Sequence, residues 1–342
     1  MTVLRGGKAD CVPFTCYSWL IPDTPTGRRL RQEGLIPIDS AGLFRIERPD
    51  IGWEQRETIE NGKRLVHSKI STPLGEVTEV TGFDPNYGSP WIREHYIKSV
   101  DDYEIIKYMY DHTSIVPSFG EYIEADRRMG DAGIVLGCID PIPVQALLVG
   151  LMGTEAWCEG VMEHEEKFTA LLESMDRIHK RQVEIAAESP AEVIWFPDNV
   201  TGTIMSPPRF DVYCRPIYDY ACKAMRQAGK LSFAHYDGAN KTLKDNIAAT
   251  DLDIIEAFTP PPMEQMTVAE ARSAWPDKVL SLNYPGNIFR EPEDAIRRWT
   301  TEYLEQGGDD GKFIIGCTED FDVNDFDRAF STIAECIREW NV

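Results

Sequence analysis

From Gly133 to the C-terminus, short apolar runs alternate with segments of helical periodicity, and this alternation limits the possible folds more than any other feature. The runs are Gly133–Asp140, Ala191–Asn199, Leu231–Gly238, Asp253–Pro262, Lys278–Gly286 and Lys312–Asp320. Each is long enough for one buried strand, and apolar residues recur at helical spacing after it. Strands that alternate with helices in this way predict an α/β fold with a parallel sheet.

We expect this sheet to close into a (β/α)8 TIM barrel. A further apolar run at Asp10–Leu20 supplies an early strand, so that eight units fit along the 342 residues. No glycine-rich phosphate loop follows these strands, so a nucleotide-binding fold has no support. The prediction is a single barrel domain over residues 1–342 with its active site at the carboxyl ends of the strands.

The N-terminal third does not follow the barrel pattern. Polar and apolar residues alternate from Ile51 to Gly82, around the turn sequences Asn61-Gly62 and Leu74-Gly75. Such alternation predicts antiparallel hairpins. We therefore expect a β-rich insertion, a cap, at about residues 21–97. The aromatic residues Tyr17, Trp19, Tyr87 and Trp91 fit packing of the core or the cap better than a pocket for a flat ligand.

The composition excludes several classes of function. The chain has 57 acidic and 35 basic residues, which give a formal charge of −22. Nucleic acids and anionic membranes require clustered lysine and arginine, so neither is an expected partner. The eight cysteines include no CxxC pair, and the chain shows neither a signal peptide nor an apolar run long enough to span a bilayer. A cytoplasmic protein with reduced cysteines is expected.

Polar residues gather where the predicted strands end. They are Asp140, Asp198, Asn199, His235, Asp237, Glu256, Cys317 and Glu319. In a barrel these residues converge on one mouth. So many carboxylates are unfavourable together without a cation, because like charges oppose each other's ionisation. One histidine, one thiolate and one carboxylate form a three-ligand zinc set with an open fourth position, which is the catalytic pattern.

Each of these residues also has a structural interpretation. His235 could be a hydrogen-bonded core residue, and Cys317 a small buried hydrophobic residue. Asp198 and Glu256 could cap the helices that follow them. The spacing of the residues leaves both interpretations open.

Several segments resemble the uroporphyrinogen decarboxylase superfamily, and in particular its methyltransferase branch. They are FPDN, SPPRFDVYCRPIYDYACKAM, HYDGAN, DIIEAFTPPPMEQMTVAEARSAWPDKVLSLNYPGNI and FIIGCTED. The resemblance implies a (β/α)8 barrel with zinc bound by a His-x-Cys pair and a C-terminal cysteine. His235 and Cys317 match two of these positions, and Asp237 stands where the middle cysteine would be. The third ligand could be Asp237, which we favour, or Asp198, Glu256 or Glu319.

The departure at Asp237 bears on the substrate. A carboxylate in place of a thiolate gives a harder ligand set and a stronger Lewis acid, which suits an oxygen substrate. The resemblance thus implies a zinc-dependent methyltransferase that acts on a small O-methyl compound, with a corrinoid supplied by a partner protein. Asp198, Glu256 and Asn199 would orient the substrate or the ligands.

Two alternative functions are carried forward. The first is a metal-free decarboxylase with Asp198 as the acid, although the segment PFTCYSWLIPD lacks the arginine that decarboxylases of the family use for substrate carboxylates. The second is a barrel with a degenerate site and no enzymatic activity. The sequence leaves the methyl donor and acceptor, the direction of transfer and the oligomeric state open.

Overall fold

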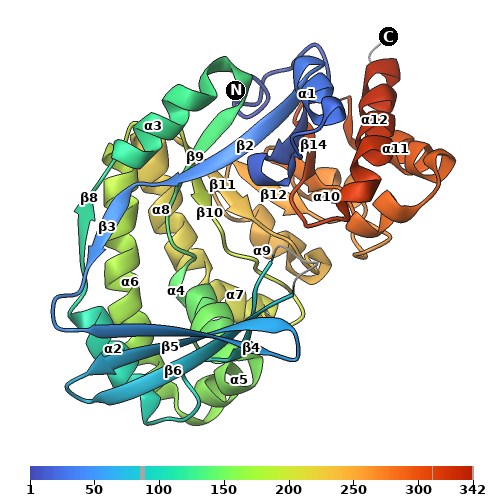
Figure 1. Ribbon diagram of the computed structural model, residues 1–342. Coiled ribbons are helices and arrows are strands. Elements are labelled where there is room, and N and C mark those ends of the chain that lie inside the picture. Colours follow the sequence, from blue (N-terminus) through green and yellow to red (C-terminus); the bar gives the residue numbers. More distant parts are fainter. Residues whose placement is uncertain (85–88, 310, 341–342) are drawn as a thin grey trace. The chain divides into compact units, whose positions relative to one another are not determined.

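A computed structural model of the chain describes residues 1–84, 89–309 and 311–340, and its main element is a closed parallel barrel of eight strands (Figure 1). The strand order is β1-β14-β13-β12-β11-β10-β9-β2. The strands are β1 (Phe14–Tyr17), β2 (Leu35–Gly42), β9 (Ile134–Cys138), β10 (Val193–Phe196), β11 (Leu231–His235), β12 (Ile254–Phe258), β13 (Val279–Asn283) and β14 (Phe313–Cys317). The predicted (β/α)8 barrel is confirmed.

The second barrel strand lies where the sequence indicated an insertion. β2 pairs with β1 on one side and with β9 on the other, so it belongs to the barrel although it falls within residues 21–97. Its sequence, LIPIDSAG, has a short apolar start followed by Asp39 and Ser40. This polar second half hides the strand from a search for apolar runs, and the pairing of both its edges identifies it.

Each barrel strand contributes one apolar residue to a cluster in the barrel interior. These residues identify which positions of each strand face inward. The eight residues are Tyr17, Ile38, Leu136, Val193, Phe233, Ile254, Val279 and Ile314, and Val3 and Leu4 from the N-terminal segment join them. Successive side chains of a strand point to opposite faces. Residues two positions further along, such as His235 and Glu256, therefore face inward as well.

The chain divides into two compact units. The first contains the barrel and comprises residues 1–43, 119–139 and 186–342. Its helices are α1 (Pro25–Gln32), α3 (Gly120–Met129), α7 (Pro207–Tyr213), α8 (Arg215–Gln227), α9 (Lys244–Ala248), α10 (Val268–Ala274), α11 (Glu293–Gly307) and α12 (Val323–Trp340). Short 3-10 turns are η1 (Ser18–Leu20), η2 (Gly130–Ala132), η4 (Lys241–Leu243) and η5 (Gly286–Arg290).

The second unit comprises residues 44–118 and 140–185 and carries two antiparallel sheets. One pairs β3 (Phe44–Glu47) with β8 (Ser114–Pro117), and the other has the order β4 (Gly52–Glu60), β5 (Lys63–Thr72), β6 (Gly75–Phe83) and β7 (Trp91–Glu94). The helices are α2 (Asp102–Asp111), α4 (Pro143–Gln145), the π-helix η3 (Ala146–Met152), α5 (Gly153–Glu163) and most of α6 (Glu165–Glu188). The hairpins predicted around Asn61-Gly62 and Leu74-Gly75 are thus present, and Tyr87 lies outside the described residues.

Two helices begin after a residue that can cap a helix N-terminus, but only one of these residues makes a capping hydrogen bond. Thr267 accepts a hydrogen bond from the Glu270 amide, and the Glu270 side chain accepts one from the Thr267 amide, which forms a capping box at the start of α10. Ser206 precedes α7, which has proline in its first turn, but the Ser206 side chain makes no capping bond. In the described part of the chain, no helix combines the length and the apolar character needed to cross a membrane.

Candidate functional site

The carboxyl ends of β1, β11 and β12 bring Tyr17, His235 and Glu256 together inside the barrel. His235 Nδ1 lies 2.6 Å from Glu256 Oε2, and the Tyr17 hydroxyl donates to Glu256 Oε1 at 2.8 Å. Glu256 is fully buried, and the His235 side chain is 14% exposed. A buried carboxylate that receives two hydrogen bonds orients the histidine ring, as in many catalytic sites. The contacts engage Nδ1, so Nε2 is the nitrogen available to a ligand or a proton.

The environment of this group favours a charged histidine. Burial alone would lower the pKa of His235, but the Glu256 carboxylate beside it and the charges of Asp237 and Asp198 outweigh burial and raise that pKa. Burial and the Glu256 charge also raise the pKa of Tyr17 well above its ordinary value. Tyr17 therefore keeps its proton and acts as a donor to Glu256.

Asp237 and Glu319 form a second group at the mouth, after the ends of β11 and β14. Glu319 hydrogen-bonds Asp237, and burial together with the Asp237 charge raises the pKa of Glu319 to about 7. The Thr259 hydroxyl donates to Asp237 Oδ1 at 2.8 Å, and Asn283 Nδ2 donates to Thr259 Oγ1 at 3.2 Å. With a pKa of about 7, part of the Glu319 population keeps its proton at neutral pH and shares it with Asp237 through this hydrogen bond. The pair is thus a potential proton donor.

The two groups together form the mouth cluster, which consists of Tyr17, His235, Asp237, Glu256, Thr259, Asn283 and Glu319. Sequence reasoning found His235, Asp237, Glu256 and Glu319 but not the three uncharged members. Asn283 ends its strand and faces inward, so the rule that strand ends carry chemistry could have found it. Tyr17 was assigned to packing because it belongs to an apolar run, and only the pairing of distant strands reveals its partner.

The backbone around the mouth cluster takes unusual conformations. Ala257 has a φ of 57°, and the pairing of β12 with β13 shifts register there. Asn199 has a φ of 55°, and its amide donates to the His235 carbonyl at 3.0 Å. Non-glycine residues in the left-handed region cost free energy and gather at functional sites. Both positions border the His235–Glu256 pair, which supports its assignment as the functional centre.

Asp198 occupies a different environment from the mouth cluster. The Tyr218 hydroxyl of α8 donates to Asp198 Oδ2 at 2.6 Å, and Asp198 is only 1% exposed. Its charge reaches His235, where it helps to raise the pKa. A carboxylate bound by a helix tyrosine at this depth is suited to positioning and electrostatics rather than to contact with a substrate.

Cys317 lies on the opposite face of its strand from the barrel interior. Cys317 is the register partner of Cys16 on β1, one residue before the inward-facing Tyr17. Both cysteines are 1% exposed and face the layer between strands and helices, where Cys317 lies near Tyr284. Burial and the nearby Cys16 raise the pKa of Cys317 well above its ordinary value. Without a cation beside it, the Cys317 thiol is therefore neutral.

The predicted zinc set does not fit this arrangement of side chains. Across residues 1–84, 89–309 and 311–340, only Glu159, Glu163 and His164 place three potential ligand atoms within 4.8 Å of one another, and they sit at the end of α5 in the second unit. Cys317 is therefore not brought to His235 and Asp237. The ligand set His235, Asp237 and Cys317 stays a prediction from the sequence.

Aromatic rings adjoin the mouth cluster. Tyr17 stacks on Trp19 with 4.5 Å between ring centroids, and Trp195 meets both Tyr17 and His235 edge-on at 5.9 and 6.1 Å. Trp19 is 57% exposed. An exposed ring stacked on a buried one offers a flat apolar surface to a substrate.

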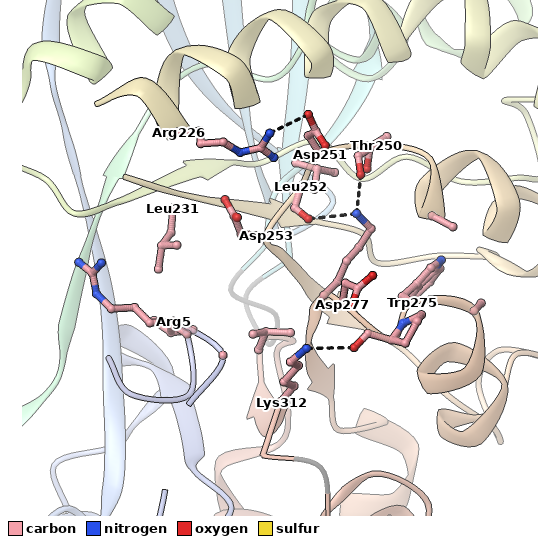
Figure 2. A pocket seen from close by; sticks show the side chains of 17 residues that line it. Arg5, Arg226, Leu231, Thr250, Asp251, Leu252, Asp253, Trp275, Asp277 and Lys312 are labelled. Atoms are coloured by element: carbon pink, nitrogen blue, oxygen red, sulfur yellow. Dashed lines mark hydrogen bonds and ion pairs between the residues drawn. The ribbon is translucent and has the colours of Figure 1, made fainter. Parts of the chain in front are cut away.

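A separate pocket of about 770 Å³ lies at the amino-terminal end of the strands (Figure 2). Arg226 pairs with Asp251 in this pocket, and Lys278 donates to the carbonyls of Thr250 and Leu252. The amino-terminal end of a (β/α)8 barrel ordinarily serves stability, so we place the functional site at the mouth cluster.

Comparison with known proteins agrees with this architecture. The sequence profile of the uroporphyrinogen decarboxylase (URO-D) family matches residues 70–318, well over half of the chain. A search of curated proteins finds no match. A methyltransferase from Methanosarcina mazei is similar in structure, with a TM-score of 0.62, 12% identity, and coverage of 100% of this chain and 97% of the other. This similarity supports the barrel fold.

Two further solved structures are less similar. A putative vitamin-B12 independent methionine synthase from Listeria monocytogenes has a TM-score of 0.37 at 12% identity, with coverage of 64% of this chain and 68% of the other. A glycoside hydrolase family 5 enzyme from Prevotella bryantii has a TM-score of 0.42 at 10% identity, with coverage of 65% and 75%.

Proposed function

Because this chain belongs to the uroporphyrinogen decarboxylase family, we propose that it is a methyltransferase that moves a methyl group from a small O-methyl substrate to a corrinoid carried by a partner protein. The observation that supports this most is the hydrogen-bonded pair of Asp237 and Glu319 beside the His235–Glu256 pair. Removing a methyl group from oxygen leaves an alkoxide or phenoxide, which needs a proton. The mouth cluster offers one at neutral pH.

Glu319 is the proposed general acid. With its pKa raised to about 7 by burial and by Asp237, a large fraction of Glu319 is protonated at neutral pH, as an acid needs to be. The carbon–oxygen bond breaks, its electron pair stays on oxygen, and the proton of Glu319 joins that oxygen. Thr259 and Asn283 hold Asp237 in place beside Glu319.

His235 is proposed to position the substrate oxygen through Nε2. Glu256 and Tyr17 fix the ring from the Nδ1 side, so the direction of Nε2 is set before the substrate arrives. Preorganised donors of this kind stabilise charge that develops in the transition state. A reduced corrinoid, when a partner delivers it, supplies the electron pair that accepts the methyl group.

The charges at the mouth argue against the decarboxylase alternative. The mouth cluster contains three carboxyl groups, those of Asp237, Glu256 and Glu319. A polycarboxylate substrate would meet repulsion there. The residue proposed as its acid, Asp198, is buried and bound to Tyr218.

The test uses free cob(I)alamin as the methyl acceptor and follows its absorbance. Aryl and alkyl methyl ethers, methylamines and methyl thioethers serve as donors. We expect transfer from the ethers, and a loss of about 100-fold or more in Glu319→Gln, because a general acid contributes on this scale. The matched control is Glu305→Gln on the exposed surface of α11, which should transfer at the rate of the unmodified protein.

Three results would contradict the proposal. Equal transfer by Glu319→Gln and the unmodified protein would remove the general acid. No methylation of cob(I)alamin by any donor, with release of carbon dioxide from a carboxylated substrate instead, would favour the decarboxylase. If His235→Ala leaves every measured activity unchanged, the barrel has a degenerate site.

A further inference from the structure

The β4 strand of the second unit forms one edge of its sheet (Figure 1). Its residues are exposed along almost the whole strand. It pairs with β5 over all nine residues, Gly52–Glu60, and within the described sheet order its other side is open. Eight of the nine residues are exposed, and the ninth, Thr58, is half-buried. A long, regular open edge is a template for another strand.

The turn that follows β4 determines which residues bond outward. Asn61 and Gly62 have φ values of 51° and 76°, and Glu60 pairs with Lys63 across this two-residue turn. The pair that closes such a hairpin is a hydrogen-bonded pair, and hydrogen-bonded pairs alternate along the ladder. Even-numbered residues of β4 therefore bond β5, whereas Trp53, Gln55, Glu57 and Ile59 direct their N–H and C=O groups to the open edge.

The same odd-numbered residues include two large exposed apolar side chains. Trp53 is 51% exposed and Ile59 is 80% exposed, and because they are six residues apart they share one face of the sheet. Both positions bond outward, so a strand placed on the edge would bring its own side chains beside them. An exposed isoleucine and tryptophan on an open edge favour association.

The sequence of β4 is complementary to itself in one antiparallel register. If two copies meet about a twofold axis through Arg56, then Trp53 of each copy lies opposite Ile59 of the other, and Gln55 lies opposite Glu57. All these pairs join outward-bonding residues, as the ladder requires. The two Arg56 side chains oppose each other, which is unfavourable, but each also lies diagonal to Glu54 of the other copy.

We propose that two copies of this chain associate by antiparallel pairing of β4 with β4, in the register centred on Arg56. The continuous ladder would satisfy the outward-facing backbone groups and would cover the two apolar side chains. A nine-residue strand gives an interface at the small end of the range for specific complexes, so association should depend on protein concentration. Each chain carries a charge of −22, and salt, which screens repulsion, should strengthen the dimer.

The first test is the mass in solution across a range of protein concentrations. We expect a rise from 38.8 kDa to twice that value, at lower protein concentration when salt is added. Gln55→Pro should keep the protein monomeric, because the amide at position 55 points to the open edge and its loss leaves the pairing with β5 intact. The unfolding midpoint and the methyl transfer of this variant should match the unmodified protein.

The second test fixes the register by disulfide formation, in a Cys11→Ser background that removes the exposed cysteine. Facing residues of a non-hydrogen-bonded pair lie about 4.5 Å apart, within disulfide range. Arg56→Cys should cross-link to itself. Glu54→Cys and Thr58→Cys should each form no cross-link alone and should cross-link when mixed.

Clear outcomes would overturn the proposal. A monomer at every concentration and salt level refutes the dimer, and a dimer that persists in Gln55→Pro shows that another surface makes it. Self-cross-linking of Glu57→Cys in place of Arg56→Cys refutes the register. None of these results bears on the methyltransferase proposal, because β4 lies outside the mouth cluster.

Discussion

Replacing Glu319 with glutamine should make the stability of the protein less dependent on pH. Burial and the neighbouring Asp237 raise the pKa of Glu319 from 4.5 to about 7 in the folded protein. A raised pKa means that the folded state resists ionisation of this carboxyl group. Its contribution to stability is therefore fully present below pH 4.5 and is lost as the pH rises through about 7.

The size of the effect follows from the two pKa values. A rise from 4.5 to about 7 corresponds to about 3 kcal/mol of stability lost between acid and alkaline pH, at ~1.36 kcal/mol per pH unit. Glutamine has the same shape and no charge to bury. The free energy of unfolding of Glu319→Gln, relative to the unmodified protein, should thus rise by about 3 kcal/mol between about pH 4.5 and pH 8.

The measurement is urea-induced unfolding of both proteins at several pH values. Comparing the pH dependence of the two proteins cancels the constant difference between an amide and a carboxylic acid in the same hydrogen bonds. Glu305→Gln on α11 is the control for changing an exposed carboxylate, and its curve should run parallel to that of the unmodified protein. If the Glu319→Gln curve also runs parallel, Glu319 ionises normally and the argument for a shared proton with Asp237 is refuted.

Three further predictions follow from particular contacts. Glu256→Gln should lower the pKa of His235, visible in an NMR titration of its ring, and should reduce methyl transfer at least 10-fold; an unchanged titration would mean that Glu256 does not charge the ring. Cys317→Ser should match the unmodified protein in zinc content and methyl transfer, since Cys317 faces the helix layer. If the folded variant contains less zinc than the unmodified protein, Cys317 is a zinc ligand. Thr267→Ala should lower the free energy of unfolding by about 1 kcal/mol through loss of the α10 cap, whereas Ser206→Ala, which removes no capping bond, should change it little.

Local patterns in the sequence predicted much of the barrel. Seven of its strands coincide with apolar runs, because a strand buried on both faces needs apolar residues throughout. The capping box of Thr267 and Glu270 was also readable, since its two hydrogen bonds join residues three apart. β2 was missed because Asp39 and Ser40 break its apolar run and its identity depends on pairing with β1 and β9.

The contacts within the mouth cluster depend on residues far apart in the sequence. Tyr17 and Glu256 are 239 residues apart, and no local pattern indicates that their strands place them 2.8 Å from each other. Glu256 could be predicted to orient a neighbour, because carboxylates behind a functional histidine are common. That the neighbour is His235 follows from the register of β11 on β12, in which the two residues are partners.

The zinc hypothesis requires Cys317 of β14 to face the barrel interior. In the structure the residue before it, Gly316, faces the interior instead. If Cys317 faced inward it would join His235, but its neighbour Gly316 takes that face. A side chain at Gly316 would lie 2.9 Å from the Leu282 carbonyl and 3.0 Å from Thr15 Oγ1, so this position accepts only glycine without movement. Gly316 occupies the inward position after Ile314, and Cys317 points to the helix layer, since successive residues of a strand alternate. Gly316→Ala should therefore disturb the mouth cluster through β14, and it should reduce methyl transfer more than Cys317→Ser does.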